Sequence, residues 1–549
     1  MTIKGSFIIC LYMLQCSLLH AQKTIPLNLD SIVPYQYNMD HKNPRMRFKV
    51  LNSAIRDNRE ITKPFAKELK EFGEKKYLAL KPLILDNDIP TLQNLIREKK
   101  LNYKDLVTFF IYRIDKYENN PERSLNAIIS LNPEAIREAE IKDKMKKNPE
   151  KNDLIFGMPV LLKDNIGYEG LPTTAGAVAL AENKTKDAFI VKKLKEKGAI
   201  ILGKTNLSEW AYYFCNGCPL GYSAIGGQSL NPYGRMIFET GGSSSGSGTA
   251  MAANYAVAAV GTETSGSILS PASLNSVTGF KPTVGLLSRT GIVPISSSLD
   301  TPGPMTKNVT DNAILMDAMT GTDEDDPLSN PTSGTVSYYK TLKNSSLKGK
   351  RFGVFRSLNE IPNYVHVSKI LSSQGAEIIE LDSQAEPLQG FLTLLNMDMK
   401  SDLTEYLLND ASPEIKLTNI DDIVSYNMEN LAIRAPYGQE RFEGILLDTT
   451  TELAFKKIKS DLENNGKSFF NEKMINNRLD AMLSVNNMHA AVAAIAKFPC
   501  LTIPMGYKTD GEPQGITIIG PSGSEANLYQ YAFKMEETFK SRKIPENYK

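Results

Sequence analysis

The chain has 549 residues, of which 41% are hydrophobic and 23% are charged, as is ordinary for a globular protein with a buried core. Its 63 lysines and arginines nearly balance its 62 acidic residues, which gives a formal net charge of +1 at pH 7. This balance gives no electrostatic reason to expect nucleic acid or an anionic membrane as a partner. The composition therefore favours a soluble protein that handles a small or uncharged ligand.

The first 21 residues have the pattern of an export signal. Lys4 supplies the positive start, the apolar run SFIICLYMLQCSLL follows, and Ala21 offers a small residue for cleavage. The run is too short to span a bilayer comfortably, so we expect no membrane span once 1–21 is removed. Export to a bacterial periplasm or secretion is the favoured interpretation. An uncleaved anchor remains open, as does lipidation at Cys16, although Gln15 is not the small residue that normally precedes a lipidated cysteine.

The next part of the chain is predicted to be helical. Residues 22–87 form a charged N-terminal helical extension, with the pattern RFKVLNSAIRDNREITKPFAKELKEFGEKKYLAL. Beyond it, Asp88 is a plausible cap for a helix over IPTLQNLIREKK, and NYKDLVTFFIYRIDKY carries apolar residues at helical spacing. We therefore expect helices throughout 88–150.

From about residue 155 the pattern becomes α/β. GMPVLLKDN, GAIILG (198–203) and YAVAAVG (255–261) indicate buried strands, and DAFIVKKLKEKG indicates a helix between them. The segment of about 330–480 is more polar and less regular, with a strand-like LKGKRFGVF and a solvated helix over IKSDLENNGKSFFNEKM. We predict one large α/β body over 88–545 with a variable insertion at about 330–480.

The cysteines give a weak signal. Without residues 1–21 the chain keeps Cys215, Cys218 and Cys500. The CxxC of Cys215 and Cys218 lacks the second pair or nearby histidine that a zinc site needs. A local disulfide in an oxidising compartment and two ordinary thiols both remain open.

The most informative stretch runs from Thr240 to Gly279 and is rich in glycine and serine at both ends, but it contains no histidine, lysine or arginine. A serine hydroxyl needs a base before it can act as a nucleophile, and lysine is a known alternative to histidine in that role. Lys163, after the apolar run MPVLL, is the candidate base. Alone, the glycine-serine pattern would indicate a flexible loop or a phosphate cradle. It lacks the Lys-Ser/Thr of a phosphate loop and the GxGxxG spacing of a dinucleotide site.

Several motifs together resemble the amidase signature family. They are GMPVLLKDN, GKTNLSEWA, GGSSSGSGTAMAAN, GTETSGSILSPASLNSVTGFKPTVGLLSRTGIVPIS, DTPGPMTKNVTD and FPCLTIPMG followed by PQGITIIG, in family order over roughly residues 88–540. The sequences of these motifs are most similar to those of bacterial peptide amidases, which remove a C-terminal carboxamide from peptides. The resemblance implies a large mixed β-sheet core covered by helices on both faces. It also implies amide hydrolysis by a Ser–cis-Ser–Lys triad, without a metal or other cofactor.

Carried over from the family, the nucleophile falls on Ser267, the bridging serine after a cis peptide bond on Ser243, and the base on Lys163. Lysine can act as a base only when neutral, and burial behind MPVLL would lower its pKa from about 10.4. Asp164 would oppose this shift, so we expect its side chain to face away. Ser243 can accept a proton from Ser267 while donating its own to the lysine.

The backbone N–H groups just before the nucleophile are the predicted oxyanion donors. They belong to Thr264, Ser265 and Gly266, which precede a predicted helix and can point into one pocket. The sequence identifies no substrate-binding residues.

Departures from the family pattern reduce the range of substrate classes that the sequence favours. Many members have Asp-Thr-Gly-Gly-Ser-Ile-Arg where this chain has Glu263 to Leu269, and the missing arginine argues against an amidotransferase subunit. Membrane fatty-acid amide hydrolases fit less well because no second apolar segment follows the first. The favoured hypothesis is a secreted peptide amidase. Alternatives are an amidase for aryl, acyl or small aliphatic amides and, less favoured, a non-catalytic binding homologue.

Overall fold

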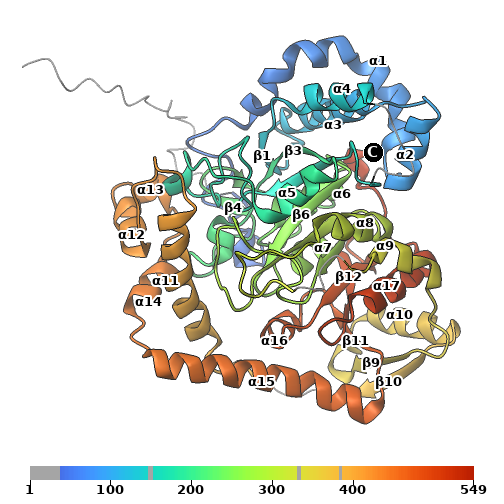
Figure 1. Cartoon of the computed structure of the whole chain (residues 1–549), viewed down its shortest axis with the longest axis vertical. Helices are drawn as coiled ribbons and strands as arrows, with labels where there is room; N and C mark the ends of the chain where they lie inside the picture. Colours follow the sequence, from blue (N-terminus) through green and yellow to red (C-terminus); the bar gives the residue numbers. More distant parts are fainter. Residues whose placement is uncertain (1–36, 146–152, 331–334, 383–385) are drawn as a thin grey trace, which may run out of the picture.

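A computed structural model describes residues 37–145, 153–330, 335–382 and 386–549, so the expected signal at 1–21 lies outside the described residues. Its centre is an 11-stranded sheet in the order β1-β3-β2-β6-β8-β7-β12-β13-β11-β9-β10 (Figure 1). The strands are β1 (Ile128–Leu131), β2 (Pro159–Lys163), β3 (Ile200–Thr205), β6 (Ala258–Glu263), β7 (Thr278–Lys281), β8 (Thr301–Thr306), β9 (Arg351–Phe355), β10 (Glu377–Leu381), β11 (Ala481–Val485), β12 (Cys500–Tyr507) and β13 (Pro513–Ile519). A small separate sheet pairs β4 (Tyr222–Ser223) with β5 (Gly227–Gln228).

The sheet is mixed: β3, β2 and β6 run parallel toward one edge, whereas the middle strands β8, β7, β12 and β13 pair antiparallel. β2 runs parallel to both β3 and β6, whereas β6 pairs antiparallel with β8. Every residue of β2, β3 and β6 is buried, as the continuous apolar runs predicted, because strands covered on both faces have no solvent side. The strand predicted at 255–261 begins later, at Ala258, because Asn254 adopts a left-handed turn conformation (φ 58°) after the preceding helix.

Helices cover both faces of this sheet, which confirms the predicted α/β architecture. One group, α6 and α7, packs together against the central strands, and a second group, α5, α8 and α17, forms its own contiguous layer. These helices are α5 (Phe189–Glu196), α6 (Ser245–Ala252), α7 (Leu269–Leu274), α8 (Val309–Met319) and α17 (Glu525–Phe539). None of the described helices has an apolar run long enough to span a bilayer.

The N-terminal helices pack on one end of the body, at the top of Figure 1. They are α1 (Ala66–Ile84), α2 (Ile89–Arg97), α3 (Tyr103–Glu118) and α4 (Ala135–Lys144). The predicted cap is confirmed, since the Asp88 carboxylate accepts from the Thr91 N–H at 2.8 Å. Arg113 on α3 donates to the carbonyl of Tyr548, so the C-terminal end of the chain packs against this group. The prediction of helices throughout 88–150 missed one strand, β1, which pairs with β3.

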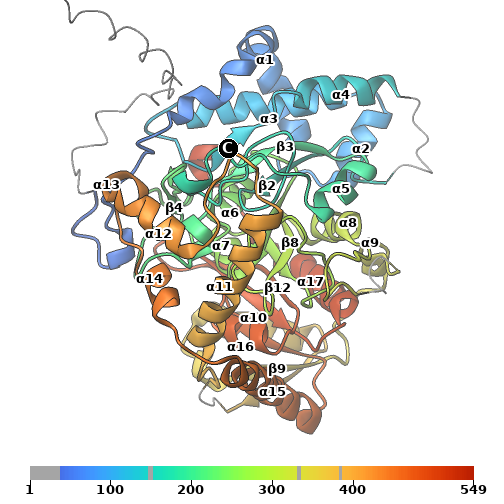
Figure 2. The same ribbon diagram turned by 60° about the vertical axis from the view of Figure 1, so that its left-hand side comes forward.

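The segment predicted as an insertion divides into two parts. Strands β9 and β10, with α10 (Pro362–Ser373), extend one edge of the main sheet. The rest is a run of helices on the outside of the molecule, at the left and bottom of Figure 1 and in front in Figure 2. These outer helices are α11 (Phe391–Asn409), α12 (Ile420–Met428), α13 (Leu431–Arg434), α14 (Glu440–Leu447) and α15 (Glu452–Asn477). The exact domain boundaries stay a prediction.

The outer helices have an apolar cluster of their own. It joins Leu403 and Phe442 to Trp210 and Phe214, so the helices are attached to the body through the loop that follows β3. Trp210 is 2% exposed, and the centroid of its ring lies 5.4 Å from that of Phe442, so it serves as a packing residue. Among the described residues, the α-helices not yet named are α9 (Tyr338–Thr341) and α16 (Ala490–Ile495).

Candidate active site

Lys163 ends strand β2, the third strand from one edge of the sheet, and its side chain is completely buried. Its Nζ lies 2.8 Å from the Ser243 hydroxyl, 2.8 Å from the Thr262 hydroxyl and 3.1 Å from the Thr262 carbonyl oxygen. Thr262 belongs to β6, the parallel neighbour of β2, and therefore lies beside the lysine across the sheet. The amine has three oxygen partners, and one of them is the predicted bridging serine.

Burial lowers the pKa of Lys163 from 10.5 to about 7, although Asp300 and Glu263 oppose that shift. Removing an ammonium from water disfavours its charged form, so a substantial share of the lysine is neutral near pH 7. The expected orientation of Asp164 is confirmed. Its carboxylate lies 3.5 Å from Lys204 Nζ and accepts from the Thr174 hydroxyl, so its partners are not Lys163.

Ser243 follows a cis peptide bond from Gly242, the arrangement that the family resemblance implied. The position before it must be glycine because a Cβ on Gly242 would lie only 2.5 Å from the Ser208 hydroxyl. The Ser243 carbonyl accepts from the Ser208 N–H at 3.0 Å, and α6 begins two residues later. The bridging serine is therefore fixed between the loop after β3 and the start of α6.

Ser267 lies in the loop that connects β6 to α7, and it is 9% exposed. Its carbonyl accepts from the Ser244 N–H at 3.0 Å, which ties this loop to the residue after Ser243. Within the residues that the structure describes, no hydrogen bond joins the Ser243 and Ser267 hydroxyls. The structure thus brings Lys163 and Ser243 into direct contact and connects Ser267 to them through the backbone.

Glu263 organises the loop that carries the predicted oxyanion donors. Its carboxylate accepts from the N–H groups of Ile268 at 2.7 Å and Leu269 at 3.0 Å, at the start of α7. Burial raises the pKa of Glu263, while nearby Lys281 and backbone groups that include Gly266 oppose the rise. Gly266 has φ 99°, a conformation that favours glycine. This role of Glu263 could not be predicted, because nothing in GTETSGS indicates that its carboxylate accepts from the N–H groups at the start of α7.

A cavity of about 100 Å³ adjoins the buried lysine site. It reaches Thr262 and Thr264 and is otherwise lined by Asn165, Ala211, Arg289, Ile292, Val293, Pro294, Ile295, Ser296, Ser297, Asp300, Thr301, Pro302 and Asp402. Asp300 is held by the N–H groups of Ile295 and Ser296, at 2.8 and 2.9 Å, and by the Thr264 hydroxyl at 2.5 Å. This cavity has enough room for part of a small substrate beside the nucleophile loop.

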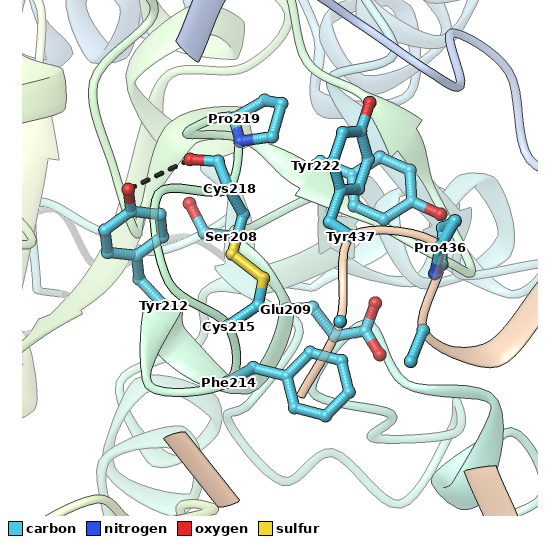
Figure 3. Close-up of a pocket in the computed structure, with 12 residues that line it drawn as sticks. Ser208, Glu209, Tyr212, Phe214, Cys215, Cys218, Pro219, Tyr222, Pro436 and Tyr437 are labelled. Carbon is cyan, nitrogen blue, oxygen red and sulfur yellow. Dashed lines mark hydrogen bonds between the residues drawn. A yellow bond between two sulfur atoms is a disulfide. The ribbon is translucent and has the colours of Figure 1, made fainter. Parts of the chain in front are cut away.

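A second, smaller pocket lies where the loop after β3 meets the outer helices (Figure 3). Cys215 and Cys218, whose state the sequence left open, are joined in a disulfide beside it. Glu209 lines the pocket, accepts from the Ala224 N–H at 2.8 Å, and has a pKa raised well above its usual value by burial. Tyr437 closes the pocket and accepts from the Lys49 N–H at 2.7 Å, so the N-terminal extension reaches this point.

No group of three histidine, cysteine or acidic side chains among the described residues is arranged to hold a metal ion. The chemistry available at the site is that of two serines, a buried lysine and backbone N–H groups. That set is suited to nucleophilic attack on an acyl group.

Comparison with known proteins connects this geometry to a family. The family model described as Amidase matches residues 105–529. The chain belongs to the amidase family. A probable amidase of Arabidopsis thaliana is 37% identical, with 84% of this chain and 92% of that protein covered. These matches identify the chain as a hydrolytic amidase.

Solved structures agree with that assignment. An amidase family protein from Bacillus anthracis is 34% identical with a TM-score of 0.85, over 89% of this chain and 98% of that one. The native peptide amidase from Stenotrophomonas maltophilia is 33% identical with a TM-score of 0.78, over 84% of this chain and 99% of that one. The amidase-signature fold predicted from the motifs is confirmed.

Proposed function

We propose that this amidase hydrolyses a carboxamide to a carboxylic acid and ammonia through an acyl-enzyme, and that its substrate is the C-terminal amide of a peptide. The observation that carries the mechanism is the contact of 2.8 Å between Lys163 Nζ and the Ser243 hydroxyl, made by an amine whose pKa is about 7. A base with a pKa near the working pH is effective because it is substantially neutral and still accepts a proton.

The partners of Lys163 direct its lone pair. A neutral amine has two N–H donors and one lone pair, and the Thr262 carbonyl can only accept. The Thr262 hydroxyl already accepts from the Asn165 side chain at 3.0 Å and has a second lone pair for the lysine. If both N–H groups donate to Thr262, the lone pair of Lys163 remains for the Ser243 hydroxyl. Thr262 and Asn165 are therefore positioning residues for the base.

The reaction then follows in two stages. Lys163 accepts a proton from Ser243 as Ser243 accepts one from Ser267, and the Ser267 oxygen attacks the amide carbon. The oxyanion of the tetrahedral intermediate receives hydrogen bonds from backbone N–H groups of 264–266. The proton returns through Ser243 to the leaving nitrogen, which departs as ammonia and leaves an ester on Ser267. Water, activated by the same route, attacks the ester and releases the acid.

The substrate proposal is supported by the likeness to the Stenotrophomonas maltophilia peptide amidase. The principal alternative is an amidase for small, aryl or acyl amides, which the limited cavity of about 100 Å³ also suits. A non-catalytic homologue is less favoured because Lys163, Ser243 and Ser267 are all present. We also propose that residues 1–21 are cleaved off and that the chain is exported to the periplasm or secreted. Lipidation at Cys16 is the less favoured alternative.

Ammonia release distinguishes the two substrate classes. The purified mature chain is incubated with a panel of N-acetylated dipeptide amides and with simple carboxamides such as propionamide and benzamide. We expect kcat/KM to be highest for the peptide amides. Turnover confined to the simple carboxamides would establish the alternative, and the absence of ammonia from every substrate would contradict both. N-terminal sequencing and cell fractionation test the export proposal.

A further inference from the structure

The loop between β11 and α16 packs directly on the nucleophile loop. A Cβ on Gly266 would lie 3.1 Å from Asn487 Nδ2, 3.4 Å from Asn487 Cβ and 3.4 Å from Ala490 Cβ. Gly266 immediately precedes Ser267, so the Asn487 carboxamide lies beside the residue next to the proposed nucleophile. This contact joins residues 221 positions apart, and no motif in the sequence indicates it.

The Asn487 side chain is exposed, and its carboxamide makes no hydrogen bond within the described residues. Its neighbours are firmly held. Asn486 exchanges two hydrogen bonds with Gly515, from its own N–H at 2.9 Å and to its side-chain oxygen at 2.8 Å. His489 Nδ1 lies 2.6 Å from the Ser484 hydroxyl, and its ring stacks on Phe355 at 4.0 Å. The loop therefore presents a solvent-exposed carboxamide, without a protein partner among the described residues, on a well-held backbone.

A carboxamide offers an NH2 group with two N–H donors and one carbonyl acceptor, which together complement the C=O and N–H of a peptide group. It is also neutral, so it does not disturb the proton affinity of Lys163 as a carboxylate would. An acyl group attached to Ser267 must leave the nucleophile loop past its exposed neighbours. Because the backbone on either side of Asn487 is already held, only its side-chain rotamers lose entropy when it binds.

We propose that Asn487 is a substrate-binding residue that hydrogen-bonds the peptide group next to the scissile amide, and so favours peptide amides over simple carboxamides. This inference rests on the proposed function. The hydrogen bond from Asn487 would allow a site that can attack any small amide to prefer peptide amides.

The test compares Asn487→Ala with the parent on an N-acetylated dipeptide amide and on propionamide, which has no neighbouring peptide group. Loss of a neutral hydrogen bond should lower kcat/KM for the dipeptide amide about 3- to 10-fold, mainly through KM. The rate on propionamide should change less than about 2-fold, because propionamide has no neighbouring peptide group to hydrogen-bond with Asn487. Met488→Ala, which alters the adjacent side chain (53% exposed), is the matched control and should leave both rates unchanged.

An Asn487→Asp variant refines the assignment, because it keeps an acceptor but loses the N–H donor, and should be at least as impaired on the dipeptide amide. Equal losses on both substrates would indicate a structural role for the loop and overturn the inference, as would parental rates in Asn487→Ala. In either case the parent's turnover of peptide amides still supports the proposed function. A parent that releases ammonia only from propionamide would instead refute the peptide substrate and this inference together.

Discussion

The parallel strands β3, β2 and β6 and the outer helices α11–α15 differ in how far their side chains are exposed to solvent. Lys163 on β2 and the adjoining Ser243 are completely buried, and these strands have no solvent-facing side. On the outer helices, Leu447 and Leu453 are 80% and 81% exposed. A lysine is therefore buried in one region of the molecule, while leucines are exposed to water in another.

The difference follows from what each region must do. A lysine reaches a pKa near 7 only where its ammonium form is deprived of water, so the base has to lie inside the core. Within the described residues, the outer helices supply no hydrogen-bond partner to Lys163. They contact the body through the loop that contains Trp210 and Phe214, and through α11, whose Asp402 lines the cavity beside the site. The chemistry should therefore tolerate changes on the exposed faces of the outer helices and fail on small changes around Lys163.

The largest expected effect is that of Ser267→Ala. Removal of the attacking oxygen should lower the rate of ammonia release by about 10⁴-fold or more, while the melting temperature stays close to that of the parent. Ser460→Ala, on exposed α15, is the matched control and should retain the parental rate. Appreciable turnover by Ser267→Ala would transfer the nucleophile role to another residue.

Lys163→Met should have the next largest effect. Methionine is similar in length but cannot accept a proton, so we expect kcat to fall by about 10²- to 10⁴-fold, the usual contribution of a general base. Far-ultraviolet circular dichroism should show an unchanged fold. A folded variant with the parental rate at neutral pH would refute the role of Lys163 as the base.

Leu161→Ala tests the packing around the base rather than the base itself. Leu161 is completely buried in β2, two residues before Lys163, so the shortened side chain should lower the free energy of unfolding by about 2–5 kcal/mol. Urea denaturation measures this loss. A loss below about 1 kcal/mol would indicate that the packing around β2 can rearrange to fill the space.

The pH dependence of the parent follows from the lowered pKa of Lys163. The neutral form is the active base, so kcat/KM should fall about tenfold for each pH unit below about 7 and level off above it. His489 does not produce this transition, because burial lowers its pKa to about 4. A profile that keeps rising tenfold per unit up to pH 10 would mean that the lysine retains its ordinary pKa.

Sequence alone predicted the residues whose surroundings are local. Lys163 stood out because an apolar run precedes it, and Ser243 and Ser267 because glycine and serine gather in family motifs. Asp88 was identifiable as a cap because the capping bond joins residues only three positions apart in the sequence. These features can be recognised without knowing how distant segments meet.

The remaining parts of the site depend on contacts between distant segments. Thr262 reaches Lys163 across 99 positions because β2 and β6 are parallel neighbours. Asn487 reaches Gly266 because the loop before α16 packs on the loop before α7. Neither contact can be predicted from a local sequence pattern. The short strand β1 was missed for the same reason, since only its pairing with β3 distinguishes it from the surrounding helices.

The smallest expected effect is that of Leu453→Ala at the start of α15. The side chain is 81% exposed, so its loss removes little buried area and should change the free energy of unfolding by no more than about 0.5 kcal/mol. Ammonia release should stay at the parental rate, because α15 supplies no partner to Lys163. A leucine-to-alanine substitution should therefore lower the free energy of unfolding strongly in β2, at Leu161, and hardly at all in α15, at Leu453. A destabilisation of about 2 kcal/mol or more would mean that Leu453 is covered in solution, and sedimentation velocity of the two proteins would show whether a second copy covers it.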